Sequence, residues 1–219
     1  MIREYARQTR LYDMLREVMR YYRSRRALHD WEQSGRPVPP PREFKRETVK
    51  RYGRKFGQDV LVETGTFQGD MIEATKLHFR EIYSVELSQE LYRAACRTFA
   101  RHRHVHLLQG DSAVVLRELL PKLNSPPLIW LDAHFSGDGT ARGESVTPVV
   151  KELEAILEQK QIDPVVLIDD ARLFDGTNGY PTLESVHEMI LGARGGWVFE
   201  VQDDIIRTHP PRPRTGSRP

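Results

Sequence analysis

Short apolar runs alternate with helical segments from Gln58 onward, and this alternation constrains the fold more than any other feature of the chain. The runs with strand character are Val60–Glu63, Ile82–Glu86, Val105–Leu108, Leu128–Asp132 and Val165–Asp169. The segments of helical composition between them are Asp70–Phe79, Gln89–His102, Ala113–Leu123 and Thr147–Gln159. Repeated strand–helix units imply a parallel sheet that is covered by helices on both faces. We therefore expect an α/β fold with a Rossmann-like, doubly wound and mostly parallel sheet.

The end of this region departs from the parallel pattern. Trp197–Val201 and Ile205–Thr208 flank Gln202-Asp203-Asp204, which predicts a terminal antiparallel hairpin. The α/β domain is thus expected to cover residues 58–208. The tail from His209, HPPRPRTGSRP, is rich in proline and arginine and is predicted to be disordered.

Residues 1–57 are expected to form a basic helical extension with a proline-rich linker. Residues 3–29 have apolar side chains at helical spacing, namely Leu11, Met14, Leu15, Val18 and Met19, followed by Tyr22. Such a stripe packs against its own domain or against a second copy, and the second case would make a homodimer. Residues 34–42 (SGRPVPPPR) cannot be helical, and a short helix from Glu43 to Tyr52 leads to breaks at Gly53 and Gly57.

Charge is distributed unevenly along the chain. Residues 1–58 carry 16 Lys and Arg against 7 Asp and Glu, whereas the remainder carries 17 against 24. A basic arm can bind nucleic acid or an anionic membrane surface, or it can be a helical extension that is solvated or docks on an acidic partner subunit. No segment approaches the roughly 20 apolar residues of a membrane span, the first ten residues lack the apolar core of a secretory signal, and the single cysteine gives no sign of an oxidising compartment. We predict a cytoplasmic protein.

Acidic side chains follow the predicted strands one after another. Five of them lie at or just after a strand end: Glu63, Glu86, Asp111, Asp132 and Asp169. The carboxyl ends of parallel strands meet at one edge of a sheet, and ligands of open α/β sheets bind in the crevice there. The series therefore predicts a site at this edge.

The first strand leads into Glu63-Thr-Gly65-Thr66-Phe-Gln-Gly69, a predicted strand-to-helix turn. Gly65 permits a tight turn, and Gly69 lets the backbone approach a ligand or the sheet. The spacing differs from the Gly-x-Gly-x-x-Gly pattern of dinucleotide sites, which argues against an NAD-dependent oxidoreductase. An acid at the start of the loop would repel phosphates, but it suits a cationic amino acid group.

Two further positions extend this predicted cofactor pocket. Glu86 ends the second strand, where an acid commonly accepts hydrogen bonds from both ribose hydroxyls. Asp111 and Ser112 follow the third strand and could contact an adenine edge, although both residue types are also good helix N-caps. Together with the first loop, these positions describe a pocket for a nucleoside that carries an amino acid.

The stretch from about Gln58 to Thr208 resembles class I S-adenosylmethionine-dependent methyltransferases. ETGTFQG is similar to the first motif of the macrocin O-methyltransferase family and, more distantly, to that of catechol O-methyltransferases. In both groups a divalent metal is held by an aspartate after the fourth strand and an acidic or amide pair after the fifth. The resemblance assigns these roles to Asp132 in WLDAHFSG and to Asp169 and Asp170 in VLIDDARLF.

The residue chemistry is consistent with a cation at these positions. Three neighbouring carboxylates raise one another's pKa unless a cation neutralises them, and oxygen ligands favour Mg²⁺ or Mn²⁺ over zinc. The alternative is that Asp169 and Asp170 cap the following turn. His134 lies two residues after Asp132, where the resemblance implies a general base that is often acidic; a histidine there could take the proton of a hydroxyl acceptor. The glycine-rich loop from Ser136 to Glu144 is predicted to be a lid or substrate loop.

We therefore expect an S-adenosylmethionine-dependent, metal-assisted O-methyltransferase that acts on a hydroxyl of a small molecule. The resemblance alone points to a sugar or a glycosylated natural product. Two alternatives stay open: an RNA methyltransferase that uses the basic arm, and a non-catalytic scaffold with the same fold. The acidic edge and the absence of a recognisable RNA module argue against nucleic acid as the partner.

Overall fold

The structure is a computed structural model that describes residue 19 and residues 22–132 and 147–211. The chain divides into two compact units, Met1–Glu47 and Thr48–Pro219. The division falls inside helix α2 (Arg42–Phe56), ahead of the boundary at residue 57 that the sequence suggested. No helix in the described ranges is both long enough and apolar enough to cross a membrane.

In the first unit, residues 22–33 form a helix, which extends beyond the predicted end at residue 29. Trp31 is buried, lies 4.6 Å from the Phe44 ring between ring centroids, and donates a hydrogen bond to the carbonyl of Pro37 (2.7 Å). These contacts order the proline-rich linker. Most of the apolar stripe predicted for residues 3–29 lies outside the described residues, and homodimerisation through it stays a prediction.

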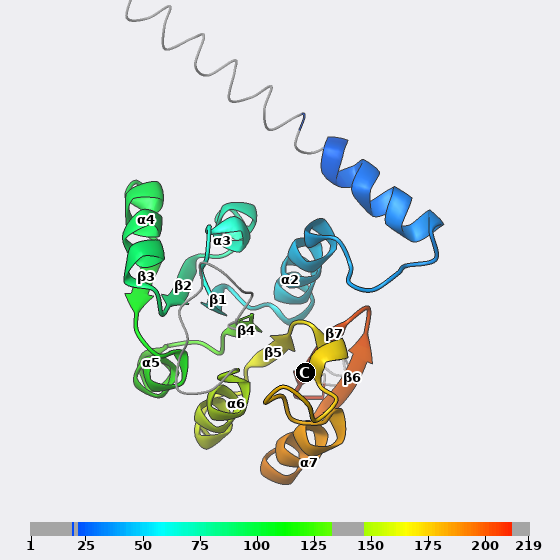
Figure 1. Ribbon diagram of the computed structural model, residues 1–219. Coiled ribbons are helices and arrows are strands. Elements are labelled where there is room, and N and C mark those ends of the chain that lie inside the picture. Colours follow the sequence, from blue (N-terminus) through cyan, green and yellow to red (C-terminus); the bar gives the residue numbers. More distant parts are fainter. Residues whose placement is uncertain (1–18, 20–21, 133–146, 212–219) are drawn as a thin grey trace, which may run out of the picture. The chain divides into compact units, whose positions relative to one another are not determined.

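A seven-stranded sheet forms the centre of the second unit (Figure 1). Its strand order is β3-β2-β1-β4-β5-β7-β6. The strands are β1 (Val60–Thr64), β2 (Glu81–Glu86), β3 (Val105–Gln109), β4 (Leu128–Leu131), β5 (Val165–Ile168), β6 (Val198–Gln202) and β7 (Ile205–His209). The first five pair in parallel, and β7 runs antiparallel to both β5 and β6. The predicted mostly parallel sheet with a terminal antiparallel hairpin is confirmed.

Helices cover both faces of the sheet (Figure 1). The helices of the second unit after α2 are α3 (Asp70–Thr75), α4 (Gln89–Phe99), α5 (Ser112–Leu119), α6 (Val149–Glu158) and α7 (Leu183–Ala193), with short 3₁₀ turns η1 (Leu120–Lys122) and η2 (Ala171–Leu173). The second half of α2 lies with α3 and α4 on one face, and α5, α6 and α7 lie on the other. This is the doubly wound arrangement expected for repeated strand–helix units.

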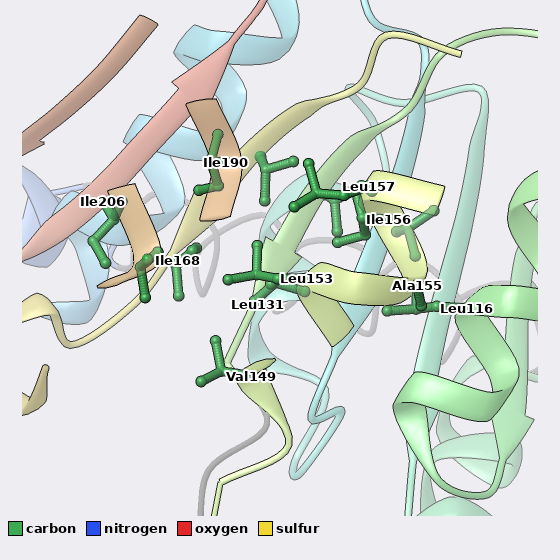
Figure 2. Close-up of a cluster of buried hydrophobic side chains, with 14 of the residues drawn as sticks. Leu116, Leu131, Val149, Leu153, Ala155, Ile156, Leu157, Ile168, Ile190 and Ile206 are labelled. Carbon is green, nitrogen blue, oxygen red and sulfur yellow. The ribbon is translucent and has the colours of Figure 1, made fainter. Parts of the chain in front are cut away.

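The main hydrophobic core lies between the sheet and the α5–α7 layer (Figure 2). Leu131, Leu153, Ile156 and Ile168 are all almost completely buried there. Because strand side chains alternate between faces, the neighbouring positions Glu63 and Trp130 point to the opposite face, toward the α2–α4 layer. The core fixes α6 against β4 and β5, and it thereby positions the carboxyl ends of these two strands.

Helix α2 does not end at Gly53, as the sequence suggested, but continues to Phe56. A Cβ atom at Gly53 would lie 2.8 Å from the Phe79 ring, so the glycine permits close packing inside a helix. Gly57, with φ +67°, is the residue that stops the helix. The first glycine therefore serves tertiary packing and the second serves chain reversal.

The C-terminal hairpin is longer than predicted. Asp203 and Asp204 both have positive φ, at 51° and 63°, as a two-residue type I′ turn requires. His209 belongs to β7 and is buried, so the prediction that the disordered tail begins there is wrong. Its ring lies 4.4 Å from the Phe56 ring and 6.4 Å from the Tyr52 ring, and these aromatic neighbours explain its order.

Candidate functional site

The sequence-predicted acids gather at the carboxyl edge of the parallel strands. Asp132 directly follows β4 and donates its backbone N–H to the carbonyl of Thr64 in β1, at 3.3 Å. Asp169 directly follows β5 and donates its N–H to the carbonyl of Leu131 (3.0 Å). The strand order reverses direction between β1 and β4, so the crevice of an open α/β sheet is expected between these two strand ends.

Glu63 is held by a short chain of hydroxyl groups. Its Oε2 atom accepts a hydrogen bond from Oγ of Ser84 (2.6 Å), and Ser84 Oγ lies 2.6 Å from Oγ1 of Thr66. Ser84 and Trp130 are the register partners of Glu63 in β2 and β4, so all three side chains share one face of the sheet. Glu63 is 2% exposed. The carboxyl is therefore preorganised in a dry environment.

Burial raises the pKa of Glu63 to about 8. The hydrogen bond from Ser84 opposes this shift, whereas the charges of Asp132 and Glu86 add to it. An acid with such a pKa is mostly protonated at neutral pH, and a cation beside it would stabilise the ionised form. The surroundings of Glu63 thus favour a cationic ligand group.

Glu86 organises the loop between β1 and α3. Its Oε2 atom accepts the N–H of Phe67 and its Oε1 atom accepts the N–H of Ser88, both at 2.8 Å. Phe67 has φ +48° and a 42% exposed side chain, so the loop turns sharply at this residue. A carboxylate offers about four acceptor sites, and Glu86 keeps acceptor capacity beyond the two amide donors.

Gly65 and Gly69 both adopt positive φ, as the turn after β1 requires, at 82° and 76°. Gly65 donates its N–H to the carbonyl of Val85 (2.9 Å), which ties the turn to β2. A Cβ atom at Gly69 would overlap the ring of Phe99 in α4. The close approach at Gly69 is therefore to helix α4 and not to the sheet, and an approach to a ligand stays a prediction.

Gly69→Ala is expected to lower the free energy of unfolding by about 2 kcal/mol, since it adds left-handed backbone strain and an overlap with Phe99. Chemical denaturation monitored by circular dichroism measures this change. Gly192→Ala in α7 is the matched control, because nothing lies within 4 Å of a Cβ atom there and alanine favours helices. Equal stability of the two variants would contradict the packing role of Gly69.

Asp111 is the N-cap of α5. Its Oδ1 atom accepts the N–H groups of Ala113 (3.0 Å) and Val114 (3.2 Å), as the capping alternative predicted. Ser112 is the first residue of this helix and is buried. Whether Asp111 and Ser112 also contact an adenine edge stays a prediction.

The acids after β5 are engaged by protein donors. Asp169 is buried, and its Oδ1 atom accepts the N–H of Asp170 at 2.8 Å. Asp170 is buried in a left-handed conformation (φ 55°), and its Oδ1 atom accepts Nη1 of Arg172 at 2.8 Å. The same Arg172 Nη1 atom pairs with Oδ2 of Asp204 in the hairpin turn. Arg172 therefore joins two strand ends through one guanidinium group.

A small cavity lies beside these acids, with a water-accessible volume of about 10 Å³, about the room for one water molecule. It is lined by Leu131, Thr147, Val149, Glu152, Ile168, Asp169, Phe174 and Tyr180. Burial raises the pKa of Tyr180 to about 12, and the charges of Asp170 and Asp132 add to this shift. The phenol therefore stays protonated at neutral pH.

His134 and the loop from Ser136 to Glu144 lie outside the described residues, so their predicted roles stay predictions. Within the described ranges, no three His, Cys, Asp or Glu side chains are grouped as a metal site would require. Asp132, Asp169 and Asp170 thus share an edge of the sheet without forming a ligand cage.

Sequence reasoning missed three residues of this edge. Ser84 is a polar residue inside a buried strand, and the pattern EIYSVE carried that signal. Glu152 is 1% exposed, although it is one of several charged residues in the amphipathic helix α6 (VVKELEAILE) and so gave no sign of burial in the sequence. Asp204 comes from the distant hairpin turn, and only its tertiary position brings it to Arg172.

No family model matches the sequence, and no curated protein matches it. Solved structures are similar in fold. The SAH-bound methyltransferase PaMTH1 of Podospora anserina is 17% identical, with a TM-score of 0.55 over 85% of this chain and 88% of that one. An O-methyltransferase of Bacillus cereus in complex with SAH is 13% identical, with a TM-score of 0.55 over 85% and 90%.

A third structure is the O-methyltransferase TomG of Streptomyces achromogenes in complex with SAM, involved in tomaymycin synthesis. It is 14% identical, with a TM-score of 0.57 over 86% of this chain and 89% of that one. At these identities the similarity concerns the fold. The chain has the fold of class I S-adenosylmethionine-dependent methyltransferases across most of its length.

Proposed function

We propose that this chain, which has the class I methyltransferase fold, is an S-adenosylmethionine-dependent O-methyltransferase that acts on a hydroxyl of a small molecule. The observation that carries the proposal is Glu63, a buried carboxyl at the strand ends where this topology predicts the ligand crevice, whose pKa is raised to about 8. Three solved structures with this fold are described as methyltransferases, and all three were solved with SAM or SAH bound.

The residues present fit the proposed cofactor. S-adenosylmethionine would supply a methyl group on a positively charged sulfur, together with the ammonium group of its amino acid portion. Glu63 would ionise and bind the ammonium group, with Ser84 fixing the carboxylate. Glu86 would accept the ribose hydroxyls, and Gly65 and Thr66 would form the wall of the pocket. Gly69 would shape the same loop, and Asp111 and Ser112 would border the adenine.

We assign removal of the acceptor's proton to His134, and we assign Asp132, two residues before it in the sequence, to the same step. A histidine titrates near neutral pH and can take a hydroxyl proton as the nucleophilic oxygen forms its bond to carbon. We expect His134→Ala to lower turnover about 100-fold and to leave the affinity for S-adenosylhomocysteine nearly unchanged. Turnover equal to that of the wild type would remove His134 from the mechanism.

The predicted metal set fits this structure poorly. Asp170, one of the three proposed ligands, already pairs with Arg172, and one oxygen of Asp169 accepts a backbone N–H. We therefore derive no step through Mg²⁺ or Mn²⁺. A sugar or glycosylated acceptor rests on the family resemblance alone, and an acceptor that reaches this site would meet an acidic edge.

Isothermal titration calorimetry with S-adenosylmethionine, S-adenosylhomocysteine and NAD tests the proposal. We expect the first two to bind and NAD to give no heat, because the acidic loop disfavours a pyrophosphate. A panel of hydroxylated acceptors with radiolabelled methyl donor then tests transfer. NAD binding would overturn the methyltransferase assignment, and cofactor binding without transfer across the panel would favour a non-catalytic scaffold.

A further inference from the structure

Arg172 lies at the acidic edge in a position that the proposed function does not use. Its side chain is 35% exposed, while the carboxylates of Asp170 and Asp204 that flank it are 9% and 1% exposed. The guanidinium pairs with both carboxylates through the same nitrogen, Nη1. One cation is thus placed between two nearly buried anions.

Backbone contacts hold this arrangement in place. The N–H of Arg172 donates to Oδ1 of Asp204 (2.8 Å), and the N–H of Ala171 donates to the carbonyl of Asp204 (2.9 Å). Hydrogen bonds to both the side chain and the backbone of Asp204 therefore connect the turn η2 to the β6–β7 hairpin turn. Arg172 cannot move away from Asp170 without losing contacts to Asp204.

A divalent ion at Asp170 would have to compete with this guanidinium. Like charges repel strongly in a partly buried site, where the effective dielectric constant is well below that of water. Buried carboxylates need a cation near them, and here a side chain of the chain itself provides it. The need for positive charge that the acidic cluster creates is therefore met in part without a metal.

We propose that Arg172 is the resident cation of this edge, in the place where the family resemblance implies a divalent metal, and that the chain transfers methyl groups without a metal ion. Only the claim of metal-independent methyl transfer rests on the proposed function. In this arrangement Arg172 is a positioning residue, which holds Asp170 and the hairpin turn beside the crevice.

Titration of the full chain with Mn²⁺, followed by the electron paramagnetic resonance signal of free Mn²⁺, tests the inference. The wild type is expected to bind no Mn²⁺ tighter than about 1 mM, whereas Arg172→Gln is expected to gain a site at least about 10-fold tighter. Asp170→Asn added to that variant should remove the gained site. Arg80→Gln is the matched control. Arg80 pairs with exposed Asp59 (2.7 Å), and these two residues directly precede β2 and β1, at the amino-terminal edge of the strands and away from the candidate site.

Several results would overturn the inference. One is tight Mn²⁺ binding by the wild type that is lost in Asp170→Asn, and another is a folded Arg172→Gln variant with no gained site. Folding is checked by circular dichroism, because the substitution takes a guanidinium group away from two buried carboxylates. Should that variant unfold, the wild-type titration decides.

The same samples separate this inference from the proposed function. If wild-type protein binds S-adenosylhomocysteine and also holds Mn²⁺ tightly through Asp170, the function stands and the inference fails. If the nucleoside gives no binding heat, the function fails, whereas the Mn²⁺ titration still decides whether Arg172 occupies a cation site. If a chelator leaves methyl transfer unchanged, this supports the claim that the reaction needs no metal ion. If the chelator abolishes methyl transfer, this contradicts that claim.

Discussion

Glu63→Gln is expected to weaken S-adenosylmethionine binding about 100-fold, which corresponds to about 2.7 kcal/mol. The variant keeps the size of the side chain and an acceptor for the Ser84 hydroxyl, so it removes the negative charge and little else. A buried carboxylate that binds an ammonium group makes a charge-assisted interaction that an amide cannot replace. Calorimetry on wild type and variant measures the difference.

Proton release distinguishes this role from a general structural effect. Because the pKa of Glu63 is about 8 in the unliganded protein, a cation that binds at pH 7 must displace close to one proton. Calorimetry in buffers of different ionisation enthalpy counts that proton, and Glu63→Gln should release none. Glu73→Gln is the matched control, since Glu73 is a half-exposed acid of α3 that pairs with Lys76.

The choice of ligand identifies the partner of Glu63. S-adenosylhomocysteine keeps the ammonium group and lacks the positive charge on sulfur. If the carboxylate binds the ammonium group, Glu63→Gln should therefore lower the binding affinity for both compounds by the same factor. A loss confined to S-adenosylmethionine would contradict this pairing and would place Glu63 near the sulfur.

The sheet was predictable because its signal is local. In the sequence, the segments of β4 and β5 are apolar runs that are each followed by an aspartate. In the structure, each strand ends at the residue before that aspartate. The failures occurred where tertiary packing decides. Gly53 resembles a helix break until Phe79 occupies the space above it, and His209 resembles a tail residue until the α2 aromatic rings surround it.

The candidate site was predictable only in part, for the same reason. Glu63 and Asp132 lie at strand ends, and topology alone brings strand ends together. The pairing of Arg172 with Asp204 depends on how the hairpin pairs with β5 in the sheet, which no periodicity in the sequence encodes. Ser84 shares a face with Glu63 through inter-strand register, and register is a property of the assembled sheet.

The stability of the unliganded protein should depend on pH through Glu63. The pKa of this carboxyl is raised from 4.5 to about 8 by folding, so between these values the folded state keeps a proton that the unfolded state has lost. The free energy of unfolding should therefore fall as the pH rises, by up to about 1.4 kcal/mol per pH unit from this group. The contribution is fully present below about pH 4.5 and is lost by about pH 8.

Urea denaturation of wild type and Glu63→Gln between about pH 5 and about pH 8 isolates this contribution, since every other titrating group is common to both proteins. The variant should gain stability relative to the wild type as the pH rises, by several kcal/mol over the range. A bound ammonium group removes this slope: with saturating S-adenosylhomocysteine the carboxylate is ionised in the folded state as it is in the unfolded state, so the wild type should lose the pH dependence that Glu63 causes. Parallel stability curves for the two unliganded proteins would mean that Glu63 is ionised in its buried position, and the argument for a cation-seeking carboxyl would then fail.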